Sequence, residues 1–183
     1  MITREESLER VKRHVKNENL VKHMIAVSAI MRGVAERLGE DPVLWEAVGM
    51  LHDIDYEDVG EDWERHGLVS AEMVADSLPE EGLHAIKAHN SMTGVEAKSQ
   101  MDVTLFAADA LSGLVVATGL MMPDKKLAQV KVRSLKRKFK DSSFARGVSR
   151  ENVMRCEEIG IGFEEFLELG LASMQAVSEE LGL

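Results

Sequence analysis

The chain has 183 residues, of which 45% are hydrophobic and only 4% aromatic, and its formal net charge at pH 7 is −10. This length predicts a single domain over 1–183, and the scarcity of strand-forming aromatic residues favours helices. A lone cysteine excludes an intrachain disulfide, and the first residues lack the basic-then-apolar pattern of a signal peptide, so we expect a cytoplasmic protein.

Capping residues and hydrophobic spacing predict helices along the whole chain, and no segment has the alternating pattern of a strand. Thr3 with Glu6 is a capping box, Gly39 is a helix stop, and Pro42 suits the first turn of a helix. A loop is predicted at 55–65. The predicted helices cover 3–14, 19–38, 42–53, 66–78, 79–89, 102–120, a basic segment after 123, a short piece at 142–146, a helix capped by Ser149, and 163–181.

Charge is unevenly distributed, because Lys and Arg are concentrated between 124 and 140 and the remainder of the chain is strongly acidic. An acidic body repels nucleic acid, which argues against nucleic acid as a partner. The basic segment could contact phosphate or a protein partner, although a solvated helix face explains it more simply.

Residues 104–123 are almost continuously apolar, and their length is close to that of a membrane-spanning helix. Asp109 interrupts this segment, and a carboxylate inside lipid costs about 2.5–3.5 kcal/mol even on a lenient insertion scale. We therefore predict a buried core helix that carries one aspartate, and no membrane partner.

Three polar residues stand at the inward faces or ends of the predicted helices. His52 and Asp53 end the third helix side by side and could supply half of a metal site. His23 shares a helix face with apolar residues and should point toward the core. Taken alone, such a histidine is more often a hydrogen-bonded core residue than a metal ligand.

Asp109 is harder to explain as an ordinary core residue. A carboxylate on a nearly pure apolar helix must be paired, protonated or bound to a metal, and Lys87 or Arg32 could be its partner. Two imidazoles and two carboxylates in order on three inward-facing helices favour the metal.

The order of His23, His52-Asp53 and Asp109 resembles the H…HD…D signature of the HD-domain superfamily of metal-dependent phosphohydrolases. The letters LHDI at 51–54 resemble that family's helix end, although the family often has glycine where this chain has Asp55. The similarity extends over about 20–120 and leaves 121–183 as a C-terminal helical extension.

Three further segments resemble a subgroup with additional histidines, similar to the HD-type dinucleoside polyphosphate hydrolases. They are HGLVSAE at 66–72, AIKAH at 85–89 and FAAD at 106–109. His14 and His84 match no motif and are interpreted as ordinary surface or core residues.

The resemblance implies an all-α, single-domain helical bundle of the HD-domain type whose core holds one or two divalent metal ions. Mixed imidazole and carboxylate ligands suit Fe, Mn, Co, Ni or Zn, and Mg is possible. In the subgroup Asp53 would bridge two ions. The implied ligands are His23, His52, Asp53, His66, His89 and Asp109.

The function implied is hydrolysis of a phosphate monoester or diester in a nucleotide or related small metabolite by metal-activated water, with His52 and Asp53 as catalytic residues. Lys87 is a candidate for substrate binding. One alternative is a catalytically silent helical module that binds nucleotide or protein and keeps a structural metal. Another is an interaction domain that uses the basic helix.

The acidic residues after the third helix offer a different metal site. Asp53, Asp55, Glu57 and Glu64 occupy positions 1, 3, 5 and 12 of an EF-hand loop, but Asp58 stands where the sharp turn requires glycine. We therefore expect a solvated, mobile loop that gates the metal site.

Overall fold

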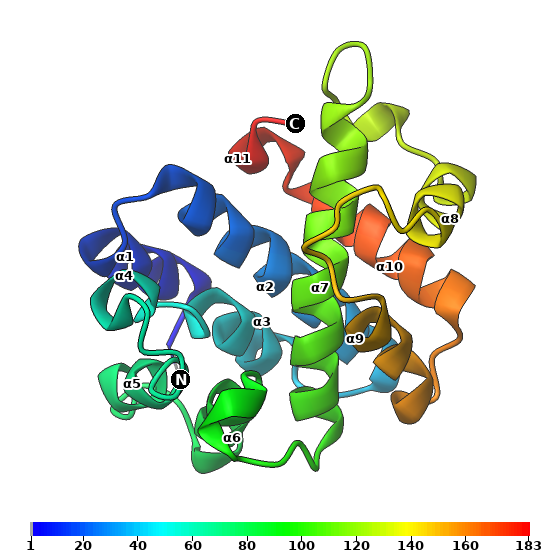
Figure 1. The fold of residues 1–183 in the computed structure, drawn as a ribbon. Coiled ribbons are helices and arrows are strands. Elements are labelled where there is room, and N and C mark those ends of the chain that lie inside the picture. Colours follow the sequence, from blue (N-terminus) through cyan, green and yellow to red (C-terminus); the bar gives the residue numbers. More distant parts are fainter. Residues whose placement is uncertain (1) are drawn as a thin grey trace.

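Helices make up the regular structure throughout residues 2–183, the part of the chain that the computed structural model describes, and no strand occurs there (Figure 1). Short 3-10 turns occur at Ser91–Thr93, Leu127–Gln129 and Arg155–Ile159. The α-helices are α1 (Arg4–His14), α2 (Glu18–Leu38), α3 (Pro42–Leu51), α4 (Tyr56–Val59), α5 (Leu68–Met73), α6 (Glu80–Ala88), α7 (Gln100–Leu120), α8 (Val132–Lys140), α9 (Arg150–Met154), α10 (Phe163–Ala176) and α11 (Ser178–Leu181).

The helices with clear end signals begin and end close to their predicted positions. Thr3 and Glu6 form the expected capping box of α1, and Gly39 ends α2 in the left-handed conformation at φ +78°. The Asp41 carboxylate accepts hydrogen bonds from the first backbone N–H groups of α3. The all-α prediction is therefore confirmed.

Other boundaries were predicted wrongly. The helix expected at 66–78 is the shorter α5, because Gly67 has φ +89° and turns the chain between His66 and the helix. The helix expected at 163–181 breaks at Val177 into α10 and α11. The loop expected at 55–65 contains α4, and the basic segment is helical only in α8.

Helix α7 runs through the middle of the molecule, with α2 and α3 on one side and α8, α9 and α10 on the other (Figure 1). Its side chains are apolar on nearly every face, which is typical of a helix buried all round. By length and composition alone it could also cross a membrane, but 67% of its apolar 18-residue window is buried inside the chain. The burial agrees with the predicted core helix, and the absence of a membrane partner stays a prediction.

Helices α2 and α3 form an antiparallel pair that approaches very closely at Gly49. A Cβ atom added to Gly49 would lie 2.8 Å from the backbone Cα of Ser28 and 2.9 Å from the Met31 side chain. Glycine therefore lets α3 lie directly against α2, and it sits three residues before His52. The close contact fixes where the end of α3 lies relative to α2.

We predict that Gly49→Ala lowers the free energy of unfolding by about 1–3 kcal/mol, because the added methyl group forces apart two packed backbones. Urea denaturation followed by far-UV circular dichroism measures the change. Gly147→Ala is the control, since a Cβ atom there would meet nothing within 4 Å. Equal stability of the two variants would contradict the packing argument.

Candidate metal centre

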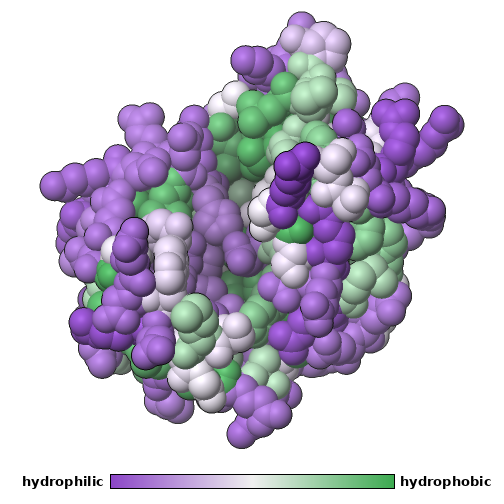
Figure 2. Space-filling model, viewed as in Figure 1, coloured by the Kyte–Doolittle hydropathy of each residue, from purple (hydrophilic) through white to green (hydrophobic). Residues whose placement is uncertain are grey.

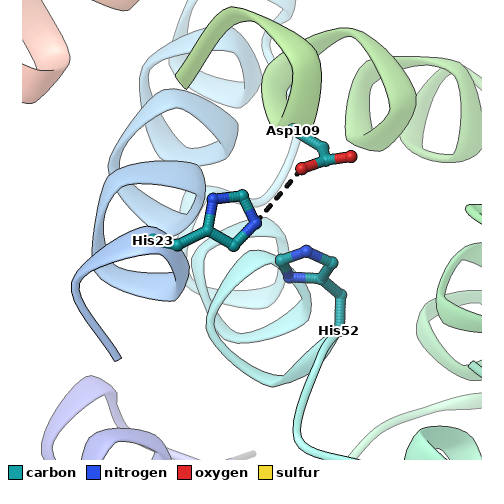
Figure 3. A group of neighbouring side chains, drawn as sticks. All are labelled: His23, His52 and Asp109. Carbon is teal, nitrogen blue, oxygen red and sulfur yellow. Dashed lines mark ion pairs between the residues drawn. The ribbon is translucent and has the colours of Figure 1, made fainter. Parts of the chain in front are cut away.

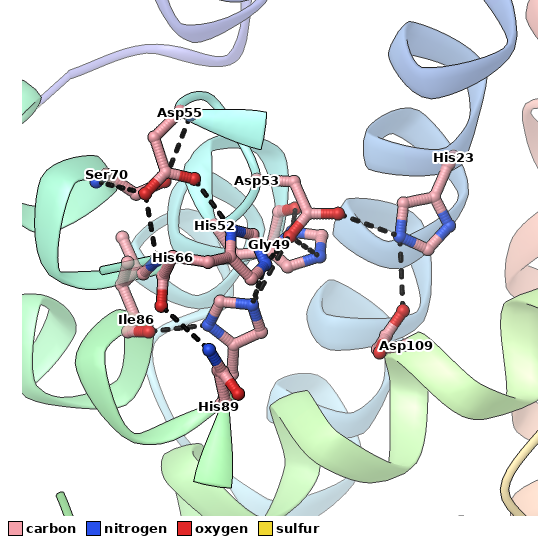
Figure 4. Close-up of polar contacts among 12 residues, drawn as sticks. His23, Gly49, His52, Asp53, Asp55, His66, Ser70, Ile86, His89 and Asp109 are labelled. Carbon is pink, nitrogen blue, oxygen red and sulfur yellow. Dashed lines mark hydrogen bonds and ion pairs between the residues drawn. The ribbon is translucent and has the colours of Figure 1, made fainter. Parts of the chain in front are cut away.

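All six predicted ligands converge on one place between α2, α3, α6 and α7 (Figures 3 and 4). They come from separate elements, so the centre depends on the tertiary fold and not on one local motif. The residues are His23 of α2, His52 and Asp53 at the end of α3, His66 just before α5, His89 at the end of α6, and Asp109 of α7.

Asp53 lies in the middle of this cluster (Figure 4). Its Oδ1 atom is 3.2 Å from the Nε2 atom of each of three imidazoles, those of His52, His66 and His89. The Nε2 atoms of His66 and His89 are also 3.2 Å apart. A buried carboxylate needs compensating positive charge, which protons on these imidazoles or a bound cation can supply.

His23 connects Asp53 to Asp109 (Figure 4), and its contact with Asp109 is also drawn in Figure 3. Its Nε2 atom lies 3.1 Å from Oδ1 of Asp109 and 3.5 Å from Oδ2 of Asp53. The His23 and His52 ring centroids are 5.4 Å apart. The two carboxylates and two imidazoles of the HD signature are therefore brought together in space.

Neither cation considered as a partner for Asp109 contacts it. The Arg32 guanidinium is 2.9 Å from Glu46, and the Lys87 ammonium is 3.4 Å from Glu80. A simple structural ion pair therefore does not explain Asp109. Lys87 also does not line the cavity over the cluster, so its substrate contact stays a prediction without structural support.

The two histidines at helix ends are held by their own helices. Nδ1 of His52 lies 2.9 Å from the carbonyl oxygen of Gly49, and Nδ1 of His89 lies 2.5 Å from that of Ile86. A carbonyl oxygen only accepts, so each Nδ1 carries the proton and donates it. The Nε2 lone pairs then face the cluster, which is the orientation that a metal ligand needs.

The other two histidines are held by side chains. Nδ1 of His66 lies 2.8 Å from Oδ1 of Asp55. Nδ1 of His23 lies 3.2 Å from the Ser112 hydroxyl, which itself donates to the backbone carbonyl of Asp109. The Ser112 oxygen is thus free to accept from His23, and all four imidazoles direct Nε2 inward.

The residues fit a divalent cation. The buried Nε2 atom of His52 is close to Asp53 but forms no hydrogen bond with it or with any other described residue. Burial lowers the pKa of His52 to about 4, so this nitrogen keeps a free lone pair. Nitrogen and carboxylate donors together suit transition metals. Two overlapping groups have ligand atoms within 4.8 Å of one another, namely His23, His52 and Asp109, and His52, Asp53 and His89.

Protons balance the carboxylates when no cation is bound. Burial lowers the pKa of His23, but hydrogen bonds and charge from Asp109 and Asp53 more than offset it and raise the pKa to about 10. Burial also lowers the pKa of His66, but hydrogen bonds and charge from Asp53 and Asp55 more than offset this effect and raise the pKa to about 9. The pKa values of both Asp53 and Asp109 are lowered, because the imidazole contacts outweigh desolvation.

The acidic loop is largely exposed over residues 56–65, as predicted, but Asp55 at its start is not solvated. Its side chain is fully buried. Besides His66, it accepts hydrogen bonds from the backbone N–H groups of Gly67 at 2.8 Å and Ser70 at 2.9 Å. Asp55 therefore fixes both the His66 ring and the turn into α5, in the manner of a carboxylate behind a metal-bound histidine.

The EF-hand alternative is wrong for a related reason. Glu57 accepts hydrogen bonds from the backbone N–H groups of Lys16 at 3.1 Å and Asn17 at 2.8 Å, while Asp55 is committed to His66. These two carboxylates are engaged at different places and do not form a common calcium site.

Sequence reasoning missed Asp55 and Ser112 as functional residues. The sequence does not distinguish Asp55 from the neighbouring acidic residues, because its hydrogen-bond partners lie 11–15 residues further along the chain. Ser112 carried a usable signal, because it follows Asp109 by three residues and so shares its helix face. The two unmatched histidines lie outside the cluster: His14 is exposed, and His84 pairs with Asp102 at 3.0 Å.

A cavity of about 470 Å³ opens over the cluster. It is large enough to admit a small phosphorylated molecule. The face seen in Figure 2 is hollowed near its centre, and apolar side chains gather above the hollow, over the C-terminal end of α7. The cavity is lined by Leu20, His23, Asp53, Tyr56, His66, His89, Asn90, Ser91, Phe106, Asp109 and Asn152.

We predict that Asp55→Asn weakens metal binding about 10- to 100-fold, because an amide cannot replace both oxygen acceptors that hold His66 and the α5 turn. Competition with a chromophoric chelator measures the dissociation constant. The matched control is Asp58→Asn, an exposed carboxylate in the same acidic segment. Unchanged affinity in Asp55→Asn would rule out the positioning role.

Metal binding to chelator-treated protein at about pH 7.5 should release about two protons, because the raised pKa values keep His23 and His66 protonated until a cation replaces those protons. Isothermal titration calorimetry in buffers of different ionisation enthalpy counts them. His23→Gln should release about one proton fewer, whereas His14→Gln should match the wild type. Binding without proton release would show that these imidazoles are not ligands.

The comparisons with known proteins agree with this geometry. The family model described as HD domain matches residues 20–114. Ribonuclease Y of Clostridium botulinum is 37% identical over 101 residues, which cover 52% of this chain and 18% of the relative. The ribonuclease Y of Lawsonia intracellularis is 32% identical over 101 residues, and that of Enterococcus faecalis is 35% identical over 99 residues. Each of these matches also covers 52% of this chain and 18% of the relative.

The match to these relatives covers about half of this chain and less than a fifth of their own length. Their name is that of a ribonuclease, so the expectation that nucleic acid is excluded as a partner is not supported. No solved structure matches the chain at the level at which these relatives were found. The matched residues include the whole H…HD…D set, and the chain belongs to the HD domain family.

Proposed function

We propose that this protein is a metal-dependent phosphohydrolase that cleaves a phosphate ester of a nucleotide or a related small metabolite. The observation that carries the proposal is the convergence of four inward-facing Nε2 atoms and two carboxylates. All of these residues except the fully buried His52 line one cavity. Membership of a family of hydrolases supports it. The four residues of the HD signature would hold one ion, and His66 and His89, together with Asp53, would hold a second.

When bound, divalent cations at this centre would polarise a phosphoryl group and lower the pKa of a water molecule. The chain's own contribution is rigidity. Each imidazole is anchored at Nδ1 before substrate arrives, so little reorganisation is needed during the reaction. The Asn152 amide and the Ser91 hydroxyl line the same cavity and can donate hydrogen bonds to phosphate oxygens.

RNA is the second substrate class that we propose to test, because the relatives found by comparison are ribonucleases. A nucleotide monoester and an RNA diester both present a phosphoryl group to the centre. They differ in the group that leaves and in the number of phosphate oxygens that are esterified. A panel of both therefore separates phosphomonoesterase from phosphodiesterase activity. The cytoplasm, where both substrates occur, is the location that we propose.

We predict that Asp53→Asn and His52→Gln each lower turnover about 100-fold or more, since even indirect partners of a metal ligand contribute 10- to 100-fold. Metal content per chain should fall with turnover while far-UV circular dichroism stays unchanged. Hydrolysis of nucleoside monophosphates, bis(p-nitrophenyl) phosphate and a short RNA is measured with added Mn²⁺. The control is His14→Gln, an exposed histidine at the end of α1.

The outcomes separate the alternatives. Full turnover in either centre variant would overturn the proposal. A wild-type protein that holds metal but hydrolyses nothing in the panel would instead be the silent binding module. A wild-type protein that is purified without chelator and carries no metal would favour an interaction domain.

A further inference from the structure

Two exposed aromatic side chains lie beside the metal centre. Tyr56 is 40% exposed and Trp63 is 38% exposed, and their ring centroids are 5.5 Å apart. Both rings also pack nearly perpendicular to His66, at 5.5 and 5.9 Å. The chain has one tyrosine and two tryptophans, and the other tryptophan, Trp45, is 3% exposed in the core.

The two rings are held in place. Tyr56 follows the fully buried Asp55 and lines the cavity over the centre. The side-chain amide of Asn90 donates to the backbone carbonyl oxygens of Trp63 at 2.6 Å and His66 at 3.1 Å. Asn90 therefore ties the segment that carries the aromatic pair to the end of α6, next to His89.

We propose that Tyr56 and Trp63, whose ring planes are inclined by 64°, form an aromatic platform in which a nucleobase stacks on the face of one ring and meets the other ring at its edge, so that the attached phosphate lies at the metal centre. This inference rests on the proposed function and narrows its substrate class to base-bearing phosphate esters. Stacking on an aromatic ring needs no particular base edge, because every base has a π-face.

A neighbouring cavity is less suited to a base. It has a volume of about 440 Å³ and shares His23 with the cavity over the centre. Its lining includes the aliphatic side chains of Val116, Leu120 and Leu181 and has no phenylalanine, tyrosine or tryptophan. It offers apolar contact but no stacking surface. Leu120, which is 50% exposed at this second cavity, therefore provides a control for the loss of exposed apolar surface.

The test uses the full chain loaded with Mn²⁺ and compares adenosine 5′-monophosphate with ribose 5-phosphate, which lacks the base. We expect Tyr56→Ala and Trp63→Ala each to weaken binding of the nucleotide between about 5- and 150-fold, the range for loss of one stacked base. Binding of ribose 5-phosphate should be unchanged. Tyr56→Phe and Trp63→Phe keep a ring and should retain most of the affinity, and Leu120→Ala should behave as the wild type.

Intrinsic fluorescence gives a readout that does not depend on turnover. The nucleotide should quench the tryptophan emission of the wild type but not that of Trp63→Phe, since the remaining Trp45 is buried. A single-stranded oligoadenylate in place of the mononucleotide shows whether the base comes from RNA or from a free nucleotide. Quenching by either ligand supports the platform.

The two proposals fail in different ways. Nucleotide binding at Trp63 without release of phosphate would refute the hydrolase and leave the platform standing. Equal affinity for the nucleotide and ribose 5-phosphate, or alanine variants that bind both as the wild type does, would refute the platform even if phosphate is released.

Discussion

The structure depends on the need to accommodate one buried negative charge, the carboxylate of Asp53. Its Oδ1 atom is 3.2 Å from three imidazole nitrogens, and its other oxygen faces a fourth. Removal of a carboxylate from water is costly, so this geometry is stable only with protons or cations among the nitrogens. Because the four imidazoles come from four different parts of the chain, their arrangement requires α2, α3, α5 and α6 to keep fixed relative positions.

The histidines at the C-terminal ends of α3 and α6 have two structural effects. The last carbonyl groups of a helix lack partners within the helix, and His52 and His89 satisfy them by bonding back to Gly49 and Ile86. The same hydrogen bonds fix the tautomer that presents Nε2 to the cluster. The C-terminal ends of α3 and α6 also carry partial negative charge, which favours a cation nearby.

Helices with local end signals could be predicted from the sequence, as Thr3, Gly39 and Pro42 illustrate, and so could the meeting of His23 with Asp109, since both had to face inward. His66 and His89 were predicted only through resemblance to a family. Asp55 could not be recognised, because its burial depends on a turn at Gly67 that brings partners from later in the chain. The break at Val177 likewise has no local signal such as proline or glycine.

Metal chemistry by itself discriminates poorly among phosphate esters, since it acts on the phosphoryl group that all of them share. Selectivity must then come from residues that contact the remainder of the substrate. The matched segment covers 18% of the ribonuclease Y relatives, so the match gives no information on how this chain would select among phosphate esters. In this chain the cavity walls near the centre include Tyr56, which packs against Trp63. The buried Asp55 contacts His66 and immediately precedes Tyr56, so a single short segment both orients an imidazole of the cluster and forms part of the cavity wall.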